Sequence, residues 1–160
     1  MMTAGLDGFP AAAGPQDARL VIAGCSRRKR AGTTPVPALD LYEGGSIPWL
    51  RARLGSHPGF RRRVRILSAE HGLLEADSPV LPYDRRLDAA RARELAAVVA
   101  GAMARDWSGS GAPGEVLVIA EPLYLVPLAG LLATPARVRW VPDPYDTAQA
   151  GRVLDQWGWP

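Results

Sequence analysis

The stretch RLVIAGCSRRKR, residues 19–30, decides the fold that we expect for this chain. Residues 19–23 form a short, mostly apolar run that ends at Gly24, which is typical of a strand buried on both faces. The turn that follows contains the only cysteine and the only lysine of the chain, Cys25 and Lys29, together with three arginines. This stretch predicts a central strand that brings a strongly basic turn to one edge of a sheet.

Apolar runs of the same kind recur along the chain and alternate with helical patterns. Strands are predicted at residues 64–68, 115–120 and 138–141. Helices are predicted at residues 47–54, between 88 and 111, at 122–132 and at 148–157. The strands alternate with helices and three of the four are apolar on both faces, which favours a single α/β domain. Its mostly parallel sheet of four to five strands would be covered on both sides, in a three-layer, Rossmann-like arrangement.

Local signals refine these elements. Ser46 is predicted to cap the first helix, which has Pro48 in its first turn, and Asp88 is predicted to cap the long one. Residues 68–74 are interpreted as a loop whose two leucines pack into the core. Residues 61–63, three consecutive arginines, are interpreted as a solvated turn at the amino-terminal edge of the sheet.

Composition narrows the class of protein. The chain has 160 residues, a formal net charge of +3 and 18 arginines against one lysine. One cysteine excludes an intramolecular disulfide and two histidines exclude a three-histidine centre, so we predict neither a metal nor a cofactor. Residues 1–17 are interpreted as a disordered leader before a domain at 18–160. With no signal sequence and no membrane-length apolar run, we expect a cytoplasmic protein without a membrane partner.

Polar residues follow each predicted strand, and open α/β sheets bind their ligands outside the carboxyl ends of the strands. After the first strand, the turn offers Cys25, Ser26, Arg27 and Lys29. Backbone N–H groups of such a turn and its cations attract a phosphate, with Lys29 or Ser26 in direct contact. The spacing is not that of a Walker A loop. A solvated basic turn beside a structural cysteine is the alternative interpretation.

Three carboxylates are candidates for acid–base chemistry. Glu70 follows the second strand next to His71, Asp84 lies in a Pro-Tyr-Asp segment, and Glu121 follows the third strand. A surface Glu–His pair and an acidic residue at a helix start are also common without any function. Tyr145, between two aspartates after the fourth strand, is either a base-stacking platform or part of an ordinary turn.

Several of these segments resemble a bacterial domain family of unknown function. The resemblance rests on Cys-Ser-x-x-Lys at 25–29, Pro-Ala-x-x-Leu-Tyr at 37–42, Leu-Ser-Ala-x-x-Gly-Leu-Leu at 67–74 and Pro-Tyr-Asp at 82–84. Looser matches follow at Tyr124, Gly151, Leu154 and Trp157. The central loop is also similar to that of the YaaA peroxide-stress proteins.

This resemblance implies an α/β domain associated with DNA or nucleotide chemistry. Carried over residue by residue, it supports these site positions: Cys25, Ser26, Lys29, Tyr42, Ser68, Gly72, Tyr83, Asp84 and Tyr124. It does not single out Glu70, His71 or Glu121, and the family usually has a tyrosine where this chain has His71.

The leading functional hypothesis is a small enzyme that acts on a nucleotide or nucleobase, at an N-glycosidic or related bond. The turn at 25–29 would hold a phosphate, a tyrosine would bind the base or sugar, and a carboxylate would stabilise oxocarbenium-like charge or move a proton. Catalytic roles are predicted for Lys29, Glu70, Asp84 and Glu121. Substrate binding is predicted for Cys25, Ser26, Arg27, Tyr42, Ser68, His71, Gly72, Tyr83 and Tyr124.

Two alternatives belong to other classes. One is a non-catalytic DNA-binding stress protein that contacts phosphates through its arginines. The other makes Cys25 a redox or nucleophilic residue assisted by Lys29. The expected partner is thus a nucleotide or nucleobase-containing small molecule, with nucleic acid second, and whether the chain forms a homodimer stays open. A lysine kept in an arginine-rich chain suggests a role that a guanidinium would not fill.

Overall fold

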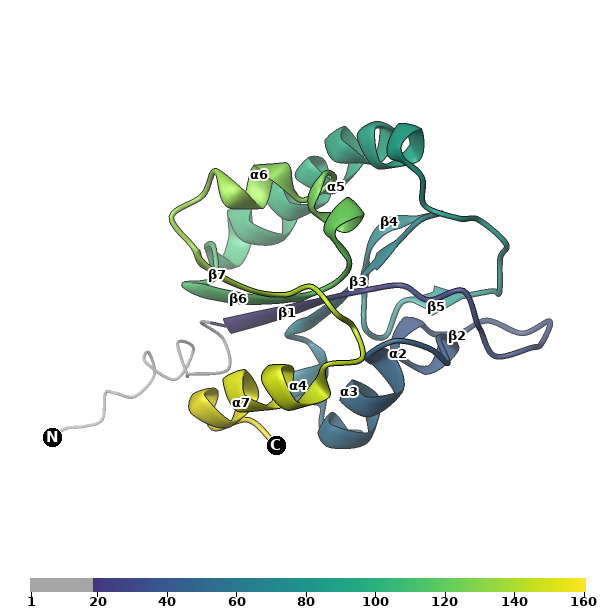
Figure 1. The fold of residues 1–160 in the computed structure, drawn as a ribbon, viewed down its shortest axis with the longest axis horizontal. Helices are drawn as coiled ribbons and strands as arrows, with labels where there is room; N and C mark the ends of the chain where they lie inside the picture. The colour runs from purple at the N-terminus through teal and green to yellow at the C-terminus, as the bar shows by residue number, and fades with distance from the viewer. Residues whose placement is uncertain (1–18) are drawn as a thin grey trace, which may run out of the picture.

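A five-stranded, mostly parallel β-sheet lies at the centre of the structure (Figure 1). The computed structural model describes residues 19–160, and the predicted leader at 1–17 lies outside the described residues. The strands are β1 (Arg19–Gly24), β3 (Val64–Ser68), β4 (Gly72–Glu75), β6 (Glu115–Ile119) and β7 (Arg137–Val141), in the spatial order β4-β3-β1-β6-β7. Within this sheet only β4 is antiparallel to its neighbour. The predicted α/β class and parallel sheet are confirmed.

Helices lie on both sides of the sheet (Figure 1). One side carries α2 (Ala38–Leu41), α3 (Ile47–Leu54), α4 (Pro58–Arg61) and α7 (Thr147–Trp157). The other carries α5 (Ala89–Ser110), the 3₁₀-helix η2 (Pro122–Leu125) and α6 (Ala129–Leu132). Val21 and Ala23 of β1 pack into the first apolar cluster, and Leu20 and Ile22 into the second. Residues 20–23 are all apolar because helices cover both faces of the strand. A separate pair of short strands, β2 (Val36–Pro37) and β5 (Pro79–Val80), is antiparallel.

The chain reverses its direction across the sheet at β1. From β1 it crosses through α2, α3 and α4 to β3 on one side, and from there it returns through α5 to β6 on the other side of β1. Neighbouring strands β1 and β6 therefore leave the sheet toward opposite faces. Such a switch point opens a crevice outside the carboxyl ends of the two strands.

Two sequence interpretations of secondary structure were wrong. Residues 72–75 form strand β4 rather than a loop, because Leu73 and Leu74 pack on opposite sides of the sheet and so act as strand residues. The predicted helix at 122–132 is divided into η2 and α6. Pro127 lies between the two helices and has no N–H to donate to a helical hydrogen bond, which favours a break in the helix there.

The predicted helix starts had different outcomes. Asp88 caps α5, because its carboxylate accepts the backbone N–H of Arg91 at 2.7 Å. Ser46 precedes α3 but makes no side-chain capping bond, and its buried hydroxyl has no hydrogen-bond partner among residues 19–160. None of the helices within residues 19–160 is long and apolar enough to cross a membrane.

Candidate functional site

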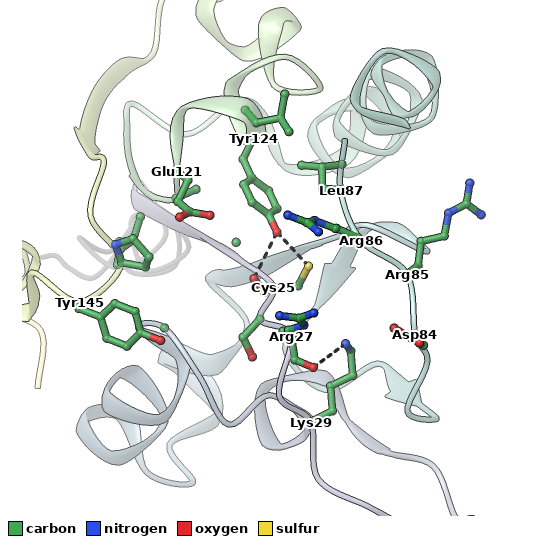
Figure 2. A pocket seen from close by; sticks show the side chains of 17 residues that line it. Cys25, Arg27, Lys29, Asp84, Arg85, Arg86, Leu87, Glu121, Tyr124 and Tyr145 are labelled. Atoms are coloured by element: carbon green, nitrogen blue, oxygen red, sulfur yellow. Dashed lines mark hydrogen bonds between the residues drawn. The ribbon is translucent and has the colours of Figure 1, made fainter. Parts of the chain in front are cut away.

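A pocket of about 610 Å³ opens at the carboxyl ends of β1 and β6 (Figure 2). Its position is the switch point of the sheet, and its volume lies in the range of about 300–1,000 Å³ that small-molecule sites occupy. Gly24 and Ile119, the last residues of the two strands, line it. A Cβ at Gly24 would lie 3.2 Å from that of Ala120 and 3.4 Å from the Tyr124 ring. Glycine therefore keeps the space between the strand ends open.

Ser26 holds the turn that follows β1. Its Oγ donates to the Arg28 carbonyl at 2.8 Å and accepts the Gly44 N–H at 3.1 Å. Ser26 does line the pocket, but its hydroxyl proton is already used inside the protein. Ser26 therefore makes the turn rigid. The charged residues of the turn remain available to contact a ligand.

Lys29 is held at the side of the pocket by two tyrosine rings. Its Nζ lies 4.3 Å from the ring centroid of Tyr83 and 5.8 Å from that of Tyr42, and it donates to the Arg27 carbonyl at 3.2 Å. The ammonium is attracted to the negative faces of the rings and keeps further N–H donors for a ligand. A position between two aromatic rings suits the compact ammonium group of a lysine, which accounts for a lysine at this position in an otherwise arginine-rich chain.

Behind Lys29, three hydroxyl groups form a directed chain. Ser68 Oγ accepts the N–H groups of Glu70 and His71, at 3.1 and 3.0 Å, so that its lone pairs are occupied. Its proton must then go to the Tyr83 hydroxyl at 2.7 Å, and Tyr83 in turn donates to Tyr42 at 2.6 Å. None of the three lines the pocket. Predicted as substrate-binding residues, they form the support behind the pocket wall.

Burial strongly affects the ionisation of these tyrosines. It raises the pKa of Tyr42 from 10.0 to about 12, and it raises the pKa values of Tyr83 and Tyr124 well above the ordinary value. The charged phenolate is poorly solvated in such surroundings. All three tyrosines therefore remain neutral near pH 7 and act as hydrogen-bonding hydroxyls.

Cys25 is half-buried in the wall of the pocket. Its Sγ lies 3.3 Å from the Tyr124 hydroxyl and accepts the Ala69 N–H at 3.4 Å. The Tyr124 hydroxyl also lies 3.3 Å from the Cys25 carbonyl (Figure 2). These contacts tie the turn after β1 to η2 and to the β3–β4 turn, so Cys25 serves here as a packing and hydrogen-bonding residue.

Residues 84–87, which we call the strap, run along another side of the pocket and all line it. The strap leads from Tyr83 toward α5 and is neither helix nor strand. Figure 2 shows the side chains of Arg27 and Arg86 reaching toward Cys25, whereas that of Arg85 points away. The sequence analysis missed both strap arginines, although they directly follow the Pro-Tyr-Asp motif.

Glu121 and Tyr145 lie on the side of the pocket away from the strap (Figure 2). Glu121 precedes η2, and its exposed carboxylate makes no hydrogen bond or ion pair within residues 19–160. The Tyr145 side chain is 72% exposed, and its N–H donates to Asp143 Oδ1 at 2.9 Å. The segment thus forms the ordinary turn that we considered and also presents a free aromatic ring to the pocket.

Three further predicted site residues lie outside the pocket lining. Glu70 pairs with Arg85 at 3.5 Å, His71 is exposed against the ring of Tyr83, and Gly72 takes a φ of +78° at the start of β4. The structure therefore gives Glu70 a partner in the strap and does not place it as a catalytic carboxylate in the pocket.

The charges that line the pocket are unbalanced. Among the lining residues, the unpaired cations Arg27, Lys29 and Arg86 outnumber the carboxylates of Asp84 and Glu121, while a fourth cation, Arg85, pairs with Glu70 and Glu94. A concave site with this excess of positive charge attracts an anionic ligand. In the part of the chain that the structure describes, no group of three or more His, Cys, Asp or Glu side chains is arranged to hold a metal ion.

The sequence was also compared with known proteins. A family model described as "Family of unknown function (DUF6884)" matches residues 20–154, which include all the pocket-lining residues. No curated protein and no solved structure matches the chain.

Proposed function

This chain belongs to the DUF6884 family of unknown function, and we propose that it is a small enzyme that binds a nucleotide and acts on its N-glycosidic bond. The observation that carries the proposal is the division of the pocket. Arg27, Lys29 and Arg86 gather on one side, and Glu121 and the exposed ring of Tyr145 lie on the other. A nucleotide has the same division, with an anionic phosphate at one end and an aromatic base at the other.

The topology supports a nucleotide ligand. The strand order β3-β1-β6-β7, with crossovers on opposite faces, supports the doubly wound, Rossmann-like arrangement that we propose for this domain. Folds of that kind bind nucleotides at the switch point, where this pocket opens. Fold alone does not define an activity, so the reaction is argued from the side chains.

The side chains suggest how the substrate lies. The phosphate would contact Arg27 and Arg86 beside Lys29, and the base would stack on Tyr145. Aromatic stacking of this kind contributes about 1–3 kcal/mol per base in nucleic-acid binders. The sugar then lies between the two ends, and its glycosidic bond comes near Glu121.

Hydrolysis at this position needs a stabiliser of positive charge. The bond between the sugar C1′ and the base nitrogen breaks, a water oxygen bonds to C1′, and a water proton goes to the base nitrogen. The products are a free base and a sugar phosphate. Glu121, whose carboxylate has no partner in residues 19–160, would stabilise the oxocarbenium-like charge or take the proton from the water.

The test is incubation of the full chain with the four common ribonucleoside 5′-monophosphates and their deoxy counterparts, followed by chromatography for released base. We expect release from at least one of them. Absence of release from all of them would overturn the proposal.

A matched pair of variants assigns the carboxylate. Glu121→Gln should lower the rate of base release by about 100-fold or more, the usual contribution of a general acid or base, with nucleotide affinity kept. Glu75→Gln removes an exposed carboxylate on β4, outside the pocket, and should leave the rate unchanged. Equal rates in the two variants would remove Glu121 from the mechanism.

The alternative proposal is a non-catalytic DNA-binding protein of the YaaA-like stress-response type, to which the similarity of the central loop points. Such binding would weaken steeply with salt, because each phosphate contact releases counterions. Many arginines of this chain are instead bonded within the fold, among them Arg51, Arg61 and Arg65. Tight, salt-dependent DNA binding without base release would favour this alternative.

A further inference from the structure

The strap is fastened at alternate residues. Tyr83, just before it, is held by the hydroxyl chain. Arg85 lies 3.5 Å from Glu70 and 3.9 Å from a second glutamate, and Leu87 packs against the apolar cluster on the α5 side. Asp88, just after the strap, caps α5. Arg85 and Leu87 are therefore held by contacts outside the strap, and Asp84 and Arg86 are the strap residues without such contacts among residues 19–160.

The intervening side chains, Asp84 and Arg86, face the pocket and are free. Both are exposed and line it, and neither makes a hydrogen bond or ion pair within the described residues 19–160. Arg27 approaches from the turn after β1 and its side chain is equally unpaired in that range. In Figure 2 the guanidinium groups of Arg27 and Arg86 lie on either side of Cys25, with the Lys29 ammonium nearby.

We propose that the turn and the strap are the two arms of a clamp for a phosphate monoester. Arg27 and Arg86 bind its oxygens directly, and Lys29 adds a third cation. Guanidinium groups bind phosphate through two parallel N–H donors each, which suits a group with three terminal oxygens. This inference specifies the anionic group of the proposed nucleotide as a single terminal phosphate. It rests on the proposed ligand but not on the proposed reaction.

Tyr83 is the positioning residue of this clamp. Its ring carries the Lys29 ammonium at 4.3 Å, and its hydroxyl fastens the start of the strap through Ser68 and Tyr42. One side chain therefore sets the spacing between the two arms. Loss of its hydroxyl should move Arg86 relative to Arg27 without touching the side of the pocket where Tyr145 lies.

Isothermal titration of the full chain tests the clamp with four probes: nucleoside 5′-monophosphates, the matching nucleosides, the matching triphosphates, and inorganic phosphate as a competitor. Monophosphates should bind about 10- to 100-fold more tightly than nucleosides, because hydrogen bonds to charged groups contribute about 1.5–3 kcal/mol each. Inorganic phosphate should compete with the monophosphates. Nucleoside triphosphates should bind no more tightly than monophosphates.

The variants separate the arms. Arg27→Gln and Arg86→Gln should each weaken monophosphate binding by about 10-fold, with no change for the nucleoside. Arg30→Gln is the matched control, since Arg30 is exposed in the same turn and does not line the pocket. Tyr83→Phe should weaken binding of the monophosphate but not of the nucleoside. A general loss of structure would weaken both.

The outcomes distinguish this inference from the proposed reaction. Phosphate-dependent binding without base release supports the clamp and overturns only the N-glycosidic proposal. Base release with equal affinity for nucleoside and monophosphate overturns only the clamp. Unchanged binding in both arginine variants, or no binding of any probe, also overturns the clamp.

Discussion

At the amino-terminal edge of the sheet, Arg61 is only 8% exposed and bonds to Asp77 Oδ1 through two nitrogens, at 2.9 and 2.7 Å. Arg65 is similarly buried and bonds to Asp106 at 3.1 Å. At the carboxyl-terminal edge, Arg27 and Arg86 are exposed and have no such partner within residues 19–160. The same residue type supports the fold at one edge and remains open to a ligand at the other.

The buried polar groups of the two edges also differ. At the amino-terminal edge they are guanidinium groups, satisfied by carboxylates and carbonyls. At the carboxyl-terminal edge they are neutral hydroxyls, those of Ser68, Tyr42 and Tyr83, satisfied by one another. Buried polar groups need partners wherever they occur. Whether an arginine is paired with a carboxylate or carbonyl therefore distinguishes the structural arginines from those that we propose bind a ligand. The number of arginines alone does not make this distinction.

The largest effect should come from alkaline pH, which acts on the hydroxyl edge. The unfolded chain releases the Tyr42 proton near pH 10, whereas the folded protein keeps it to about pH 12. Below pH 10, Tyr42 is protonated in both states and the free energy of unfolding does not depend on it. As the pH rises from 10 to 12, this one group lowers the free energy of unfolding by about 1.4 kcal/mol per pH unit. Urea unfolding at pH 9, 10, 11 and 12 measures the slope.

Two variants control this slope. Tyr42→Phe should make it shallower, since the titrating group is gone. Tyr145→Phe should leave it unchanged, because Tyr145 is exposed. A stability that is flat from pH 10 to 12 would contradict the description of this edge as a set of buried neutral hydroxyls.

At the amino-terminal edge, Arg61→Ala should lower the free energy of unfolding by about 2 kcal/mol, the usual cost of lost hydrogen bonds between charged groups. Arg62→Ala, at the exposed neighbouring position, should change it by less than about 0.5 kcal/mol. Urea unfolding measures both. Equal effects would mean that the turn is solvated throughout, as the sequence analysis predicted for residues 61–63. The pairing of Arg61 shows that this prediction was wrong for that residue.

The crevice itself is sensitive to one methyl group. Gly24→Ala places a Cβ 3.2 Å from that of Ala120, and overpacking of this kind costs about 1 kcal/mol or more. It should also weaken ligand binding. Gly109→Ala in α5 meets nothing within 4 Å and should stabilise the helix by about 0.5–1 kcal/mol. Thermal unfolding compares the two variants, and a stabilising Gly24→Ala would show that the strand ends are not closely packed.

The smallest effect on stability should come from Arg86→Gln. An exposed side chain without a partner in residues 19–160 should change the free energy of unfolding by less than about 0.5 kcal/mol. The same variant is expected to lose phosphate affinity, so stability and binding separate at this residue. A loss of stability comparable to that of Arg61→Ala would remove the difference between the two edges.

Local pattern sufficed for much of the fold. Mostly apolar runs predicted β1, β3 and β6, because strands covered on both faces need apolar side chains on each face, and the shorter run at 138–141 predicted β7. The same pattern misread residues 72–75, where a four-residue strand is too short to show a period. Among the predicted site residues, Cys25, Lys29, Asp84, Glu121 and Tyr124 line the pocket, since each follows a strand or a turn at the carboxyl-terminal edge.

The sequence by itself determined the α/β class, the central strand and the basic turn that β1 brings to the carboxyl-terminal edge. Only the tertiary structure decided which charges are free. Glu70 binds Arg85 and Arg61 binds Asp77, whereas Arg27 and Arg86 are left unpaired in the described residues. The physical reason is distance along the chain. Strand patterns depend on neighbouring residues, whereas the partner of a charged side chain depends on which distant segments the fold brings within hydrogen-bond reach.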